Sequence, residues 1–84
     1  NEFLVIELKK GRASDQALGQ LQRYMGYVDE KLATSGQQVR GCIVALNDDQ
    51  HLRYALRTTQ NIRFYQYEID FRLIEKHGNQ QVSD

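Results

Sequence analysis

The stretch FLVIELKKGR, from Phe3 to Arg12, decides how the rest of the chain is interpreted. Its apolar, partly β-branched start predicts a strand from about Glu2 to Lys9 that is covered on both faces and ends before Gly11. Side chains alternate between the two faces of a strand. One face carries Val5, Glu7 and Lys9, and the other carries Leu4, Ile6 and Leu8. Charges at the end of a buried strand are costly, so they indicate either a strand-end ion pair or a ligand site.

A helix follows this strand. Ser14 or Asp15 is a suitable N-cap, and apolar residues then recur at spacings of three and four, which predicts a helix over about Asp15–Ala33. This inward stripe consists of Leu18, Leu21, Met25, Val28 and Leu32. Gly19 and Gly26 lie seven residues apart on one flank, where we expect another element to pack closely.

The second half of the chain contains two more strands and a short helix. The apolar run Cys42–Leu46 predicts a buried strand, parallel to the first because a crossover helix joins them. Residues 47–49 then cap a short helix that reaches about Thr58. Alternating apolar and polar residues predict a half-buried edge strand over Ile62–Ile74. The expected fold is α/β: a mixed three-stranded sheet with a βαβ crossover and two helices.

The composition narrows the possible classes of protein. A chain of 84 residues allows one domain, and its single cysteine forms no internal disulfide, which favours a reducing, cytoplasmic compartment. Cys42 itself is expected to be a packed core residue. The formal net charge is zero, so any affinity for nucleic acid depends on local clusters of basic residues. Two such clusters are present: Lys9, Lys10 and Arg12, and later Arg53, Arg57 and Arg63.

The domain organisation follows from the same pattern. We expect a partial domain over residues 1–76 and a polar, flexible tail over residues 77–84. The chain opens at Asn1 almost inside a core strand, which suggests a piece of a longer protein. No apolar run is long enough for a membrane span, and nothing resembles a signal peptide.

Glu7 and Lys9 are the first candidates for chemistry. They share a strand face, and ligand sites in open α/β sheets lie beyond the carboxyl ends of strands. Carboxylates suit hard divalent cations, and a nearby lysine can act on a water or a phosphate. Gln20 and Tyr24 are neighbours on the next helix, from which both could reach the strand end. We expect Lys10, Arg12 and Arg23 to contact nucleic acid.

These residues carry a family resemblance. Glu7-Leu8-Lys9 resembles the (D/E)-x-K element of the PD-(D/E)XK nuclease superfamily, and Gln20-x-x-x-Tyr24 resembles the Q-x-x-x-Y helix motif of its RecB-like members. The order of the two motifs is similar to that in the catalytic domains of NucS-type endonucleases. The resemblance covers residues 3–28 closely and the later strands loosely. It implies the C-terminal part of a restriction-endonuclease-like fold.

The resemblance also implies an activity: Mg²⁺- or Mn²⁺-dependent hydrolysis of DNA. Glu7 and the backbone carbonyl of Leu8 would be metal ligands, Lys9 would act on the water or the phosphate, and Gln20 and Tyr24 would support the site. The superfamily requires an Asp on the preceding strand, and this chain has none there. We therefore expect these residues to be inactive alone.

Several points stay open at the level of sequence. The alternative function is a non-catalytic nucleic-acid-binding or dimerisation module on the same fold. An unpaired edge beside Phe3–Leu8 predicts a homodimer. The DNA could be branched or mismatched, or could carry single-stranded ends, and no pattern distinguishes these structures.

Overall fold

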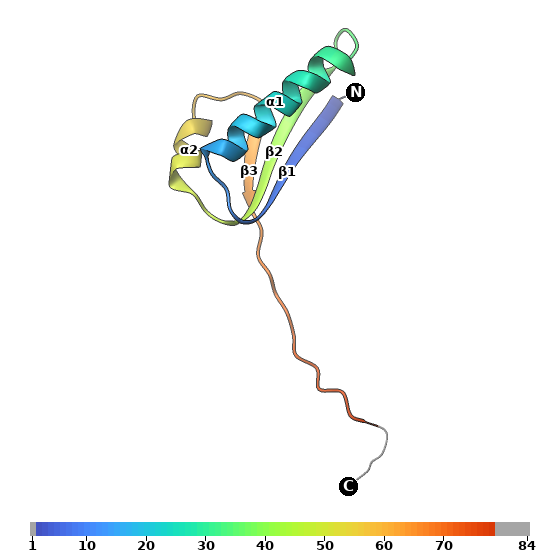
Figure 1. Cartoon of the computed structure of the whole chain (residues 1–84), viewed down its shortest axis with the longest axis vertical. Helices are drawn as coiled ribbons and strands as arrows, with labels where there is room; N and C mark the ends of the chain where they lie inside the picture. The colour runs from blue at the N-terminus through green and yellow to red at the C-terminus, as the bar shows by residue number, and fades with distance from the viewer. Residues whose placement is uncertain (1, 79–84) are drawn as a thin grey trace.

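The computed structural model describes residues 2–78 and shows one sheet with helices on one side (Figure 1). The elements follow the order β1, α1, β2, α2, β3, and the sheet order is β1-β2-β3. The bounds are β1 Glu2–Arg12, α1 Asp15–Lys31, β2 Gln38–Asn47, α2 Gln50–Leu56 and β3 Ile62–Gln66. The expected α/β class, crossover and two helices are confirmed. Both strand pairs are parallel, which refines the mixed sheet predicted from the sequence.

β1 continues past the point where the sequence predicts its end. Lys9 lies opposite Ala45 of β2, whereas Arg12 lies opposite Asn47. The register shifts between these two pairs, because β1 contains one more residue than β2 over this interval. Gly11 therefore sits in a bulge and does not end the strand. Because the bulge resets the alternation, Arg12 lies on the same face of the sheet as Lys9.

α1 packs closely on β2 at Gly41. A Cβ atom added there would lie 2.5 Å from Met25 Sδ and 2.9 Å from Leu21 Cδ2, so the missing side chain lets the helix approach the sheet. Gly19 and Gly26 were expected to mark a close contact, and this expectation is wrong for residues 2–78. A Cβ at Gly26 would meet nothing within 4 Å, and one at Gly19 would meet only Arg23.

The core lies between the two helices and one face of the sheet. Leu21, Ile43 and Leu52 are fully buried there. The expectation that β1 is covered on both faces is wrong, because its other face is bare in the described part of the chain. Its exposed members are Leu4, Ile6 and Leu8. The alternation itself is confirmed, since Glu7 and Lys9 lie on the covered face.

Cys42 and Leu32 depart from the core positions expected of them. Cys42 is only half-buried, on the bare face of β2, and burial raises the pKa of its thiol. Leu32 follows the last residue of α1 and is exposed, so the inward stripe of the helix stops earlier than its spacing indicates.

The last strand is much shorter than predicted. β3 ends at Gln66, and residues 67–78 leave the sheet as an extended segment (Figure 1). Within this segment, Tyr67 is hydrogen-bonded to the sheet. Its N–H donates to the Ala45 carbonyl, and its hydroxyl donates to the Lys10 carbonyl at 3.3 Å. β2 itself ends at Asn47, so it offers no hydrogen bonds to a strand that continued to Ile74. Most of the tail expected over residues 77–84 lies outside the described residues, which end at residue 78.

None of the described helices is both long enough and apolar enough to traverse a lipid bilayer.

Candidate functional site

Glu7, Lys9 and Gln20 form a connected group between β1 and α1. Lys9 Nζ lies 3.1 Å from Glu7 Oε2 and donates to Gln20 Oε1 at 3.4 Å. The Glu7 side chain is 16% exposed and that of Lys9 is 34% exposed, so the ion pair is shielded but open to solvent at one end. The strand places the two charges on one face, and the helix brings the amide to them. The structure thus unites three of the four catalytic residues predicted from sequence.

Tyr24 does not join this group. It lies one helical turn beyond Gln20 and is 56% exposed, and no hydrogen bond in residues 2–78 links it to Glu7 or Lys9. Leu8 lies between the two charged residues, and its side chain points to the bare face. The backbone carbonyl of Leu8 is the group that the family resemblance implies as a metal ligand.

Arg12 and Asp49 make a second ion pair beside the first group. Arg12 Nε donates to Asp49 Oδ2 at 2.8 Å, while Asp49 Oδ1 accepts from the Leu52 N–H and so caps α2. Asp49 is 5% exposed. The hydrogen bond from Arg12, then that from Leu52, holds the pKa of this carboxyl below its ordinary value. The bulge in β1 makes the pair possible, because it turns Arg12 toward α2.

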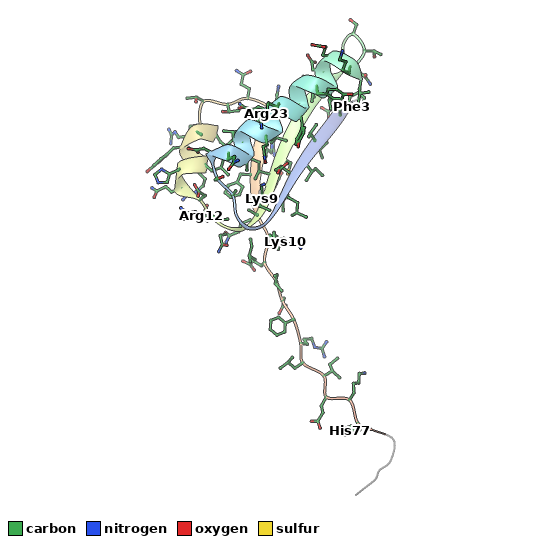
Figure 2. All side chains as sticks on the ribbon, in the orientation of Figure 1. Phe3, Lys9, Lys10, Arg12, Arg23 and His77 are labelled. Atoms are coloured by element: carbon green, nitrogen blue, oxygen red, sulfur yellow. The ribbon has the colours of Figure 1, made fainter. Side chains whose placement is uncertain are left out.

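The three residues expected to bind nucleic acid lie at the surface. Lys10 and Arg23 are exposed. Arg12 has a side chain that is 69% exposed even though its Nε is held by Asp49, so most of this side chain is open to solvent. Lys9, Lys10 and Arg12 gather around the turn from β1 to α1, whereas Arg23 lies further along the helix (Figure 2).

The residues present fit one side of a site for a hard cation. A carboxylate and a carbonyl oxygen are the donors that Mg²⁺ accepts, together with water and substrate phosphate. Residues 2–78 contain no group of three or more acidic, histidine or cysteine side chains that could hold a metal by themselves. Glu7 is therefore a single acidic donor with a lysine and an amide beside it.

A comparison with protein-family models matches residues 1–82 to the endonuclease NucS C-terminal domain. The chain belongs to this family. No curated protein and no solved structure matches the chain. The assignment makes it a nuclease-related domain, and the NucS family implies interaction with DNA and, in general, dependence on a metal.

Two features of the structure, one beside the site and one at the opposite edge of the sheet, could not be predicted from the sequence. Asp49 was recognised as a helix cap, but its second oxygen also binds Arg12, and only the register of β1 on β2 reveals that contact. Arg53, Arg57 and Arg63 were recognised as a recurring cluster. The structure shows that they line a single groove.

Asp49 should make the stability of this NucS domain depend on pH in acid. Because its folded pKa is lowered, its contribution is complete above the unfolded pKa near 4 and is lost as pH falls through the folded pKa. In urea titrations between about pH 6 and 2, we expect Asp49→Asn to lower the free energy of unfolding at pH 6 and to converge on wild type in acid. Parallel curves for the two proteins would contradict this assignment.

Proposed function

We propose that this NucS C-terminal domain supplies one side of a metal-dependent centre that hydrolyses phosphodiester bonds in DNA. The observation that carries the proposal is the Glu7–Lys9–Gln20 group, in which a carboxylate and an ammonium on the covered face of β1 meet an amide from α1. The family assignment supports a nuclease-related role. Hydrolysis would join a water oxygen to phosphorus and break the bond to the leaving oxygen, which takes up a proton.

Each residue in the group has a distinct proposed role. Glu7 and the Leu8 carbonyl would hold Mg²⁺ or Mn²⁺, which when bound would stabilise negative charge on the phosphate and favour ionisation of a water. Lys9 would orient the attacking water or pair with the phosphate. Gln20 is a positioning residue, because it acts through its hydrogen bond from Lys9. Tyr24 would contact the substrate from its exposed place on α1.

Lys10, Arg12 and Arg23 would bind the DNA around this centre. Arg12 shares the covered face of β1 with Lys9, so phosphates near the reacting bond would meet it first, whereas Lys10 is exposed at the neighbouring position of the strand. A guanidinium gives planar, paired hydrogen bonds to phosphate, and Arg12, whose side chain is 69% exposed, can provide them. A cytoplasmic location is proposed from the single, unbridged cysteine.

The second acidic group would come from a strand beside β1. β1 pairs with β2 along one edge, and its other edge has no partner among residues 2–78. A strand added there would place its own side chains next to Glu7 and Lys9. An aspartate on that strand would complete the donor set that the described residues lack.

The 84-residue chain alone is therefore expected to leave DNA uncut. Purified protein would be incubated with labelled duplex, mismatched, branched and single-stranded DNA in Mg²⁺ or Mn²⁺, and products would be resolved on denaturing gels. We expect no metal-dependent product above that of a Glu7→Gln preparation. Cleavage by the wild-type chain that Glu7→Gln abolishes would show that the centre is already complete.

The free edge of β1 also favours the alternative function, a dimerisation module. Exposed Leu4, Ile6 and Leu8 lie beside unpaired backbone groups, a combination that invites pairing with a second copy. We expect a homodimer in sedimentation experiments, and Ile6→Lys should convert it to a monomer because edge charges oppose strand pairing. A wild-type monomer at the highest soluble concentration would contradict the dimer.

A further inference from the structure

Residues 68–76 belong to the extended segment that follows β3, and we call them the arm. Ile69, Phe71 and Leu73 of the arm are 63%, 74% and 92% exposed, and they alternate with polar residues. This alternation is the pattern of a strand with one apolar face. A single strand cannot satisfy its backbone groups or bury that face by itself, so the arm fits the edge of a sheet.

The free edge of β1 offers a complementary sequence. Ile6–Leu8 places an acid, Glu7, between two apolar residues, and Phe71–Leu73 places a base, Arg72, between two apolar residues. Residues directly opposite in paired strands have side chains on the same face of the sheet. Pairing Arg72 with Glu7 therefore leaves the four apolar side chains together on the bare face.

The charges beyond this pair select the register and the direction. In an antiparallel arrangement that faces Arg72 with Glu7, Asp70 lies opposite Lys9, which gives a second pair of opposite charges. A slip of two residues one way would face Asp70 with Glu7. The same slip the other way would face Arg72 with Lys9, so both slips bring like charges together. The ion pairs within residues 2–78 involve neither Asp70 nor Arg72.

Tyr67 prevents the arm from reaching this register on its own chain. The Tyr67 N–H donates to the Ala45 carbonyl at 2.9 Å, which keeps Tyr67 in line with β3. A strand beyond β1 would be three strand spacings from β3, or about 14 Å. The stretch from Tyr67 to Asp70 spans at most about 11 Å. The strand that pairs with β1 must therefore come from a second copy.

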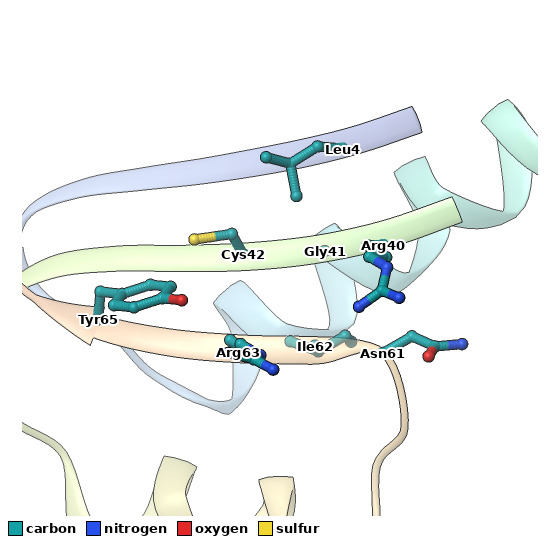
Figure 3. A pocket seen from close by; sticks show the side chains of 8 residues that line it. All are labelled: Leu4, Arg40, Gly41, Cys42, Asn61, Ile62, Arg63 and Tyr65. Atoms are coloured by element: carbon teal, nitrogen blue, oxygen red, sulfur yellow. The ribbon is translucent and has the colours of Figure 1, made fainter. Parts of the chain in front are cut away.

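The bare face beside β1 is open to such a copy. Ile6 and Leu8 are 57% and 64% exposed. Next to them, a hollow of about 530 Å³ runs across the three strands, and Leu4, Cys42 and Tyr65 are among the residues that line it (Figure 3). Apolar side chains of an added strand would bury this surface.

We propose that the arm of each copy pairs, antiparallel, with the free edge of β1 in the other copy, with Arg72 on Glu7 and Asp70 on Lys9. The inference rests on the proposed homodimer and identifies the strand that forms it. The exchanged arm would occupy the place proposed for the aspartate-bearing strand, so the homodimer is a closed form of the centre. A divalent cation at Glu7 would compete with Arg72.

Sedimentation equilibrium of the 84-residue chain in EDTA tests the arm. Arg72→Glu should raise the dissociation constant of the dimer about tenfold or more, because each dimer contains two such contacts and each changes from attraction to repulsion. The matched control is Lys76→Glu, which makes the same change in net charge at a position opposite Phe3. It should change the dissociation constant less than about twofold.

The outcomes separate the arm from the homodimer itself. A dimer that Ile6→Lys breaks and Arg72→Glu leaves intact would keep the homodimer and overturn the exchanged arm. Equal effects of Arg72→Glu and Lys76→Glu would also overturn it. A wild-type monomer at every concentration would remove both proposals.

A disulfide between two copies tests the register directly. Opposite residues of antiparallel strands have Cα atoms about 4.5–5.5 Å apart, within the range of a disulfide. In a Cys42→Ser background, a Leu8→Cys copy mixed with a Phe71→Cys copy should form the mixed disulfide, detected by intact mass spectrometry without reductant. An Ile6→Cys copy should form less of it with Phe71→Cys. Equal or greater yield from Ile6→Cys, or no mixed disulfide from either, would overturn the antiparallel arm.

Discussion

Glu7→Gln should almost abolish metal-dependent DNA cleavage in a protein in which a strand bearing an aspartate is added beside β1. We expect a loss in kcat of about 10²–10⁴ for Lys9→Met, the range typical of a positioned proton-transfer group, and at least as much for Glu7→Gln. Glu7→Gln should also raise the metal concentration needed for half-maximal rate, because an amide is a weaker ligand than a carboxylate. Single-turnover assays across a Mg²⁺ series would measure both effects.

The chain provides a matched control for this substitution on the same strand. Glu2 also lies on β1, but on the bare face, where it pairs with Arg40 at 2.6 Å in an exposed ion pair. Glu2→Gln should leave the rate and the metal requirement close to wild type. If Glu2→Gln and Glu7→Gln behaved alike, the role assigned to the Glu7–Lys9–Gln20 group would be wrong.

A substitution at Gln20 distinguishes a residue that positions Lys9 from one that takes part in the reaction directly. Gln20→Ala removes the acceptor that holds Lys9, so we expect a smaller loss of rate than for Lys9→Met. A shift in the pH–rate profile should accompany that loss, because the lysine would lose a fixed neighbour. A residue with a merely structural role would lower stability without moving that profile.

The second large effect concerns a single methyl group at Gly41. Gly41→Ala should destabilise the fold by about 1–3 kcal/mol, because the new Cβ would press on buried Leu21 and on Met25. Gly26→Ala adds the same methyl group to an open position in α1 and should stabilise the fold by up to about 1 kcal/mol. Thermal unfolding would show this as opposite shifts of several degrees.

The contrast between Gly41→Ala and Gly26→Ala tests how closely α1 packs against the sheet. The α1–β2 contact fixes the helix that carries Gln20, so a displaced helix would also disturb the hydrogen bond from Lys9. A Gly41→Ala protein as stable as wild type would mean that α1 does not approach β2 as closely as the structure shows.

Much of the centre was predictable because it depends on local periodicity. The period of two along β1 placed Glu7 and Lys9 on one face, and the crossover helix carried Gln20 to them. The position of Arg12 was not predictable, since it depends on a register shift against a strand thirty-odd residues away. The alternation in residues 67–74 is a strand pattern without a neighbouring strand among residues 2–78, so periodicity alone overstated the length of β3.

Whether Glu7 and the Leu8 carbonyl bind a metal can be measured by paramagnetic broadening of amide NMR signals by Mn²⁺ in the 84-residue chain. We expect broadening to begin at Glu7, Leu8 and Lys9 at low Mn²⁺ concentration, to persist in Glu2→Gln and to disappear from these residues in Glu7→Gln. Broadening centred on the acidic pair Asp48 and Asp49, with the signals around Glu7 unaffected, would contradict a metal site at Glu7.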